Sequence, residues 1–146
     1  MNAIDFLIKE HNHVRNLLVD VLNPSHRFDT RQKIFADLSS DLLRHETMEH
    51  TVWYPHFKSK VPDTVKHLLK EEQHAEREIK KINELKSEDA WLTHLMKFSE
   101  DVEHHAREEE GKLFPEVKAI LSEQELEQIG KQMQHFKKEY NGRSIP

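Results

Sequence analysis

The residues of this chain whose types and spacing could best support chemistry are histidines and glutamates four positions apart. The motif His-x-x-x-Glu occurs at His45 and Glu49, and sixty residues later at His105 and Glu109, each time followed by an aromatic residue and a proline. Residues four apart share one face of an α-helix, with their Cβ atoms about 5–6 Å from each other. Each motif can therefore present an imidazole nitrogen and a carboxylate oxygen to the same ion.

Two further histidines extend the repeat, because His11 and His74 each stand on the segment that precedes one of the motifs, at an offset of sixty-three residues. Each half of the chain then contains a helix with a single histidine, followed by a helix with His-x-x-x-Glu. Two such hairpins are expected to pack with pseudo-twofold symmetry and to direct the same groups into the space between them. His11 fits the apolar stripe of its segment, whereas His74 lies toward the edge of its own.

The motif residues stand where apolar side chains are expected. The spacing that brings apolar residues to one helix face also brings His105 and Glu109 there, and His45 and Glu49 hold equivalent places before Val52, which is expected to face inward. Burying unpartnered imidazoles and carboxylates costs several kcal/mol in total. Metal ions compensate that cost, and nitrogen and oxygen donors without sulfur suit iron, manganese or zinc.

The apolar periodicity predicts an all-α protein, an up-down-up-down four-helix bundle with a short C-terminal fifth helix. The expected helices cover residues 4–22, 29–58, 62–85, 88–120 and 123–140. Asp29 is a candidate N-cap, Pro55 and Pro115 are expected to kink the helices that contain them, and Ser122 with Glu125 has the pattern of a capping box. No stretch alternates with period two for long enough to predict a strand.

Composition narrows the classes to which the protein can belong. The 146 residues predict a single domain, 1–146, and the absence of cysteine excludes disulfides, thiolate zinc sites and iron–sulfur clusters. A net charge of −5 without a basic face argues against nucleic acid or a membrane as partner. The N-terminus lacks the long apolar run of a signal peptide, so we expect a cytoplasmic protein.

The ordered set of a lone histidine, His-x-x-x-Glu with an aromatic–proline pair, a second lone histidine and a second His-x-x-x-Glu resembles the hemerythrin-like, or HHE cation-binding, domain family over residues 3–120. The resemblance implies a centre of two non-heme iron ions, rather than manganese or zinc, in which Glu49 and Glu109 bridge the ions. The ligands that it implies are His11, His45, Glu49, His74, His105 and Glu109.

The chain departs from the oxygen-carrying hemerythrins in two places. Those carriers have His-x-x-x-His on the third helix, where Lys70 and Glu78 stand here, and a His and an Asp five apart on the fourth, where the spacing here is four. Glu46 directly follows its histidine, which is similar to the hemerythrin-like domain of the eukaryotic iron-sensing F-box protein, where the adjacent Glu is a ligand. The resemblance therefore makes Glu46 the first candidate for a seventh ligand, before Glu78 or Glu71.

Three further features of the sequence each allow two interpretations. His104 directly precedes a motif histidine and competes with it as a ligand if the helix is displaced by one residue. Glu71 and Glu72 are expected at the surface unless the seventh ligand comes from there. The segment 123–140 is either a cap over one face of the bundle or a dimer interface.

Tyr54 is expected in the core, with its hydroxyl able to donate a hydrogen bond at the centre.

The expected function is to bind, sense or scavenge a small oxidant, namely O2, a peroxide or nitric oxide. A carboxylate-rich ligand set favours these roles over reversible oxygen carriage, because oxygen donors stabilise the ferric state. The alternative is a regulatory or interaction module whose fold depends on the metal, or an iron-handling protein without turnover. No nucleophile elbow or Gly-rich phosphate loop indicates a hydrolase.

Overall fold

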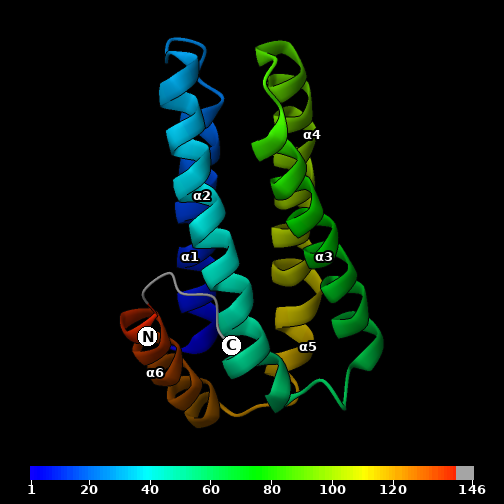
Figure 1. Cartoon of the computed structure of the whole chain (residues 1–146). Helices are drawn as coiled ribbons and strands as arrows, with labels where there is room; N and C mark the ends of the chain where they lie inside the picture. The colour runs from blue at the N-terminus through cyan, green and yellow to red at the C-terminus, as the bar shows by residue number, and fades with distance from the viewer. Residues whose placement is uncertain (141–146) are drawn as a thin grey trace.

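The computed structural model describes residues 1–140, and these residues form helices joined by short turns, with no β-strand among them (Figure 1). The helices are α1 (Ala3–Val21), α2 (Phe28–Met48), α3 (Pro62–Glu84), α4 (Glu88–Glu108), α5 (Phe114–Lys118) and α6 (Glu123–Glu139). The all-α prediction is confirmed. None of the described helices is both long and apolar enough to cross a membrane.

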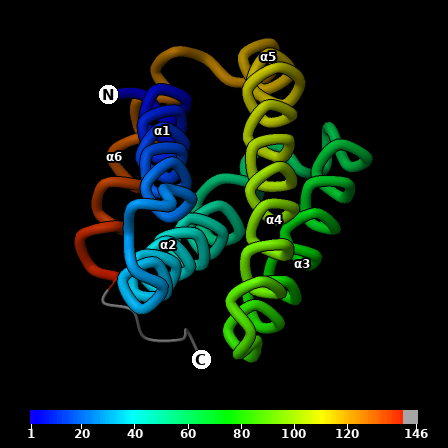
Figure 2. The backbone as a smooth tube through the Cα atoms, turned by 90° about the horizontal axis from the view of Figure 1, so that it is seen from above, coloured from blue at the N-terminus to red at the C-terminus, as the bar shows by residue number. Residues whose placement is uncertain are grey.

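The helices form two antiparallel hairpins that lie side by side. One hairpin is α1 with α2, the other is α3 with α4, and α5 continues the line of α4 (Figures 1 and 2). The last helix, α6, crosses one end of the first hairpin and packs on α1 and α2. The predicted up-down-up-down bundle with a C-terminal helix is therefore confirmed.

Local signals in the sequence set most of the helix ends. The side chain of Asn2 accepts a hydrogen bond from the backbone N–H of Asp5, and Ser122 and Glu125 form the predicted capping box in front of α6. The prediction for α2 was wrong by two residues. Its N-cap is Arg27, which makes no side-chain capping hydrogen bond within residues 1–140, and Asp29 lies in the first turn, where its charge favours the helix dipole.

Each His-x-x-x-Glu motif ends in one turn of π-helix. These turns are Glu49–Trp53, designated η1, and Glu109–Leu113, designated η3, and each comes just before a proline. A proline inside an α-helix clashes with the carbonyl group four residues earlier, and a wider π turn relieves that contact. The wider turn also shifts which side chain faces the core. Trp53 is fully buried, and Val52 is half-buried and packs against the apolar core, so Val52 faces inward less completely than Trp53.

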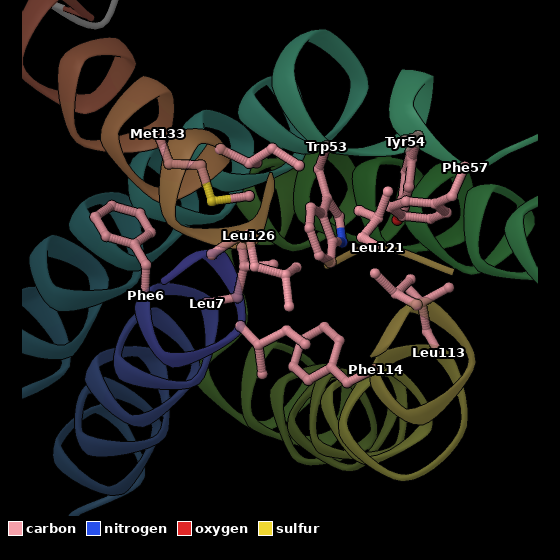
Figure 3. Packing of buried hydrophobic residues seen from close by; sticks show 14 of the residues in the cluster. Phe6, Leu7, Trp53, Tyr54, Phe57, Leu113, Phe114, Leu121, Leu126 and Met133 are labelled. Atoms are coloured by element: carbon pink, nitrogen blue, oxygen red, sulfur yellow. The ribbon is translucent and has the colours of Figure 1, made fainter. Parts of the chain in front are cut away.

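Two apolar clusters fill the bundle. The α6-side cluster packs the start of α1, the two π turns and α6, and Figure 3 shows some of its members, Phe6, Leu7, Trp53, Phe114, Leu126 and Met133. The turn-side cluster lies toward the α1–α2 and α3–α4 turns and includes Val14, Leu18, Phe35, Leu38, Trp91, Leu95 and Phe98. Between them the helices carry His11, His45, Glu49, Glu72, His105 and Glu109.

Helix α6 approaches the start of α1 closely at Gly130. A Cβ atom at this position would lie 2.3 Å from the carbonyl oxygen of Met1 and 3.0 Å from the backbone nitrogen of Ala3. The contacting atoms are backbone atoms of Met1, Asn2 and Ala3, and the chain here is held by the fully buried Ala3 at the start of α1, so these atoms cannot move aside cheaply. Glycine is therefore required here for packing, in a helix where alanine would otherwise be preferred.

We predict that Gly130→Ala destabilises the protein although alanine favours helices by about 1 kcal/mol. The overpacking cost of roughly 1–3 kcal/mol exceeds that gain, so urea denaturation should show a lower free energy of unfolding. Gly111→Ala is the matched control, because no described atom comes within 4 Å of its added Cβ. A Gly130→Ala protein as stable as Gly111→Ala would show that the contact is not tight.

Candidate metal centre

The two motifs bring their side chains together at the middle of the bundle. His45 Nε2 lies 3.3 Å from Glu49 Oε1, and His105 Nε2 lies 3.1 Å from Glu109 Oε1. His11 joins from α1, with its Nε2 atom 3.6 Å from the same oxygen of Glu109. These atoms define two overlapping groups of possible metal donors, one of His11, His45 and Glu109 and the other of Glu49, His105 and Glu109.

The two motif carboxylates are the most deeply buried charged groups of the centre. Glu49 and Glu109 have no exposed surface, and they lie close enough to interact with each other. Burial raises the pKa of Glu49 well above its usual value, and the negative charge of Glu109 raises it further. Without a cation, the burial of Glu49 therefore favours its protonated form.

The donor atoms of the centre have a marked shortage of partners. Among residues 1–140, the buried atoms that make no hydrogen bond include Nε2 of His11, His45 and His105 and both carboxylate oxygens of Glu49 and Glu109. Neighbouring ligands of one metal ion, bonded at about 2.0–2.2 Å, lie roughly 3.0–3.5 Å apart, close to the separations found here. The residues present therefore fit a metal ion in both chemistry and spacing.

The other ring nitrogen of each histidine points to an outer carboxylate. His11 Nδ1 is hydrogen-bonded to Glu110 Oε2 at 2.7 Å, and His105 Nδ1 to Glu71 Oε1 at 3.0 Å. His45 Nδ1 faces Glu10 Oε1 at a longer distance of 3.6 Å. Such carboxylate–histidine pairs fix the orientation of the ring and leave Nε2 free to bind a metal.

Basic side chains hold two of these outer carboxylates in turn. Arg15 donates two hydrogen bonds to Glu110, of 2.9 and 3.0 Å, and Lys137 of α6 donates one of 2.8 Å to Glu10. Hydrogen bonding with His11 and Arg15 lowers the pKa of Glu110 to about 2, so this carboxylate is ionised at neutral pH. The role of Glu10 and Glu110 was not apparent from the sequence, because each simply adjoins another polar residue.

Glu72 of α3 lies buried beside the centre, so the prediction of a surface position, which held only if the seventh ligand did not come from Glu71 or Glu72, is wrong for this residue. The side chain is buried, and its Oε2 atom accepts a 2.5 Å hydrogen bond from the Tyr54 hydroxyl and lies 3.7 Å from His105 Nε2. The other oxygen pairs with His50 at 2.6 Å. A signal existed, since Glu72 is four residues after Leu68 on the apolar stripe of α3.

The structure does not bring every predicted ligand to the centre. The side chain of His74 is 49% exposed and lies 3.3 Å from Asp101, where both residues line a solvent-open cavity between α3 and α4. Glu78 faces His94, with a separation of 3.7 Å. In the described part of the chain neither residue belongs to a group of converging metal donors.

Glu46 is buried next to the centre but is not one of its converging donors. Its Oε1 atom has no hydrogen-bond partner in the described residues. Burial raises its pKa to about 9, with a further contribution from the charge of Glu72. The adjacent glutamate of the first motif is therefore protonated at neutral pH when no cation is present.

Two cavities meet the centre. A small one of about 30 Å³ lies between the donor atoms and the apolar side chains of Leu42 and Val102. A larger one of about 300 Å³ opens to solvent between α3 and α4, with Glu46, Glu72 and His105 at its inner end. The second cavity gives the buried donors a connection to the surface.

Comparison with known proteins assigns the class. The hemerythrin HHE cation binding domain profile matches residues 2–117, and the chain therefore belongs to this family of cation-binding domains. A crystal structure of a hemerythrin HHE cation binding domain-containing protein from Mycobacterium kansasii is similar to this one, with a TM-score of 0.83 and 22% sequence identity, covering 94% of this chain and 86% of that chain. This likeness confirms the fold. No curated protein matches the sequence.

We predict that Glu46→Gln changes how the stability of the metal-free protein depends on pH. The difference in free energy of unfolding between the variant and the unchanged chain should shift in favour of the variant as the pH rises from acid to neutral. Glu46 keeps its proton in the folded state up to about pH 9 but loses it above about pH 4.5 when unfolded, so its contribution to stability falls as the pH rises through this window. Glutamine has no such loss. Between about pH 5.5 and 7.5 the stability difference should move by roughly 2–3 kcal/mol in favour of glutamine.

Urea unfolding of the chelator-treated proteins at the two pH values measures this shift. Glu139→Gln, at an exposed position of α6, serves as the control and should show no comparable change. A difference between Glu46→Gln and the unchanged chain that is the same at both pH values would contradict the buried, protonated state of Glu46.

Proposed function

We propose that the protein holds two non-heme iron ions at this centre and there binds a small oxidant, in order to sense or scavenge it. The observation that carries the proposal is the fully buried pair Glu49 and Glu109, whose oxygens lack hydrogen-bond partners and face three imidazole nitrogens. Two carboxylates and three imidazoles supply more donors than one closed tetrahedral zinc ion needs. Carboxylate and imidazole donors on facing helices suit a di-iron centre.

The ligand set that the geometry favours differs at one position from the set that the resemblance implies. Glu72 takes the place of His74 on α3, because its carboxylate is buried beside His105 and Tyr54 whereas the side chain of His74 is half-exposed and paired with Asp101. The proposed ligands are His11, His45, Glu49, Glu72, His105 and Glu109. Glu46 remains a further candidate at the inner end of the open cavity.

The size and lining of the cavities favour a small oxidant. Bound iron would supply reversible electron transfer and an open coordination position to O2, a peroxide or nitric oxide. The small cavity has room for only about one water-sized molecule, which suits these ligands. Leu42 and Val102 keep one side of that space apolar, and the open cavity lets small molecules reach it.

Tyr54 is placed to assist at this site. Its hydroxyl donates to Glu72, and burial raises its pKa well above the usual value, with the nearby carboxylates adding to the shift. The phenol therefore keeps its proton at neutral pH and acts as a hydrogen-bond donor rather than as an anionic ligand. It orients the Glu72 carboxylate next to His105.

The second candidate function is a module whose fold depends on metal occupancy. Its support is the same set of unpartnered buried donors, because a bundle with an empty centre of this kind lacks compensation for their burial. The two functions are compatible. They differ in whether a small oxidant changes the bound metal.

The first test is the metal content of protein reconstituted with iron(II). After desalting, which removes weakly held ions from exposed sites, we expect about two iron ions per chain by mass spectrometry, and near-ultraviolet absorption after oxidation that disappears on reduction. Glu49→Gln with Glu109→Gln should lower the content to less than half, since the two carboxylates are shared by the donor groups. His74→Ala is the matched control and should keep both ions, whereas His105→Ala should not.

Other outcomes separate the alternatives. A single zinc ion, or little metal of any kind, would contradict the di-iron proposal and leave the fold unaffected. Two iron ions whose absorption does not respond to O2, hydrogen peroxide or nitric oxide would favour the metal-dependent module. Loss of iron in His74→Ala would restore that residue to the ligand set.

A further inference from the structure

A second group of histidines and glutamates lies on the surface between α3 and α4. His67 and Glu71 form a His-x-x-x-Glu pair on α3, and His104 and Glu108 form another on α4. We call these four residues the outer cluster. The pair on α4 is one residue out of register with the buried pair of the same helix, which turns it about 100° away from the centre.

Helices α3 and α4 pack against each other in opposite directions (Figure 2). The histidine of each outer pair therefore lies opposite the glutamate of the other. His67 Nε2 lies 2.9 Å from Glu108 Oε2 and 3.6 Å from Glu71 Oε2. His104 Nε2 lies 2.8 Å from Glu108 Oε1 and 3.5 Å from that same oxygen of Glu71. Both imidazoles therefore face both carboxylates, in a closed ring of four contacts.

Three of these residues, His67, Glu71 and Glu108, have donor atoms within 4.8 Å of one another, as the ligands of one cation must. His104 contacts both carboxylates but meets the other oxygen of Glu108, so a movement of its exposed side chain brings it to the same ion. Two ligands bonded at 2.0–2.1 Å to one tetrahedral ion lie about 3.3 Å apart, and the four distances fall on either side of that value. Two imidazoles and two carboxylates form a donor set that suits zinc, iron(II) and cobalt(II). Small movements of exposed side chains are enough to equalise the distances, because His67 and His104 are 57% and 63% exposed.

The outer cluster is connected to the buried centre. Three of its members, His67, Glu71 and His104, line the open cavity whose inner end is formed by Glu72 and His105. Glu71 also spans the two sites, because its Oε2 atom faces the outer imidazoles while its Oε1 atom is hydrogen-bonded to His105 Nδ1 at 3.0 Å. A cation held at the outer cluster would thus lie at the mouth of a passage to the buried donors.

We propose that the outer cluster binds one divalent transition-metal cation and supplies it to the buried centre through the open cavity. Binding by the outer cluster stands on its own contacts, whereas supply rests on the function proposed above. The competing explanation is that the four residues are only ion pairs of a solvated surface. That explanation requires no metal affinity at this place.

Equilibrium dialysis of the metal-free protein against cobalt(II) tests the site. The unchanged chain should bind one cobalt ion more than His67→Ala with His104→Ala, or bind that ion at least about tenfold more tightly. The control is His13→Ala with His94→Ala, which also removes two histidines that each face a carboxylate, and it should bind as the unchanged chain does. Circular dichroism confirms that each variant is folded.

Equal cobalt binding by the unchanged chain and His67→Ala with His104→Ala would overturn the proposal, as would an equal loss in the control. Glu49→Gln with Glu109→Gln separates this result from the buried centre, since that variant should lose buried ions and keep the outer one. If the unchanged chain binds the outer ion but no buried ions, that result contradicts the proposed function and leaves the outer site established.

The supply role has its own readout. At limiting iron(II), the buried centre of His67→Ala with His104→Ala should take up iron several-fold more slowly than that of the unchanged chain. With excess iron, the final iron content of the two proteins should differ only by the outer ion. If iron uptake by this variant is as fast as by the unchanged chain, the supply role is overturned. The outer site itself is then still established by the difference in cobalt binding.

Discussion

The burial of two carboxylates side by side is the constraint on which the rest of this structure depends. Glu49 and Glu109 come from opposite hairpins and are both fully enclosed. Two negative charges in a medium of low dielectric repel each other strongly and have lost their water, so the surrounding residues must provide positive charge or a proton. A protonated Glu49 meets that demand in part. A bound cation meets it completely, and also gives the three facing imidazole nitrogens a partner.

The groups around this pair alternate in character from the inside outward. The central carboxylates are followed by imidazoles, then by the outer carboxylates of Glu10, Glu71 and Glu110, and two of these are followed by Lys137 and Arg15. Each layer stabilises the ionised form of the next, which holds the rings in one orientation without a rigid loop. The contact of Lys137 with Glu10 also gives α6 a part in the site, in addition to its packing on α1.

The sequence predicts the bundle and the two motifs well, because buried polar residues at apolar spacing are a strong signal. It fails on α3, where Glu72 and His74 compete for the inward position. Leu68 and Ala75 define the stripe only loosely, and a repeat-based comparison with His11 favoured the histidine. It also misses the π turn of η1, which adds a residue to the helix and leaves Val52 only half-buried against the core. Both errors arise from small rotations of a helix, which periodicity alone does not resolve.

The polar layer separates the apolar interior into two clusters with few direct contacts between them, and this division bears on how the molecule unfolds. Apolar packing is the usual source of cooperativity in a small domain, and here it is interrupted at mid-length. Apart from the helices that run through both, the side chains of the centre are then the main packing link between the α6-side and turn-side halves. A chain with a filled centre would open as one unit, whereas with the centre empty the turn-side half would open at a lower free energy than the half clamped by α6.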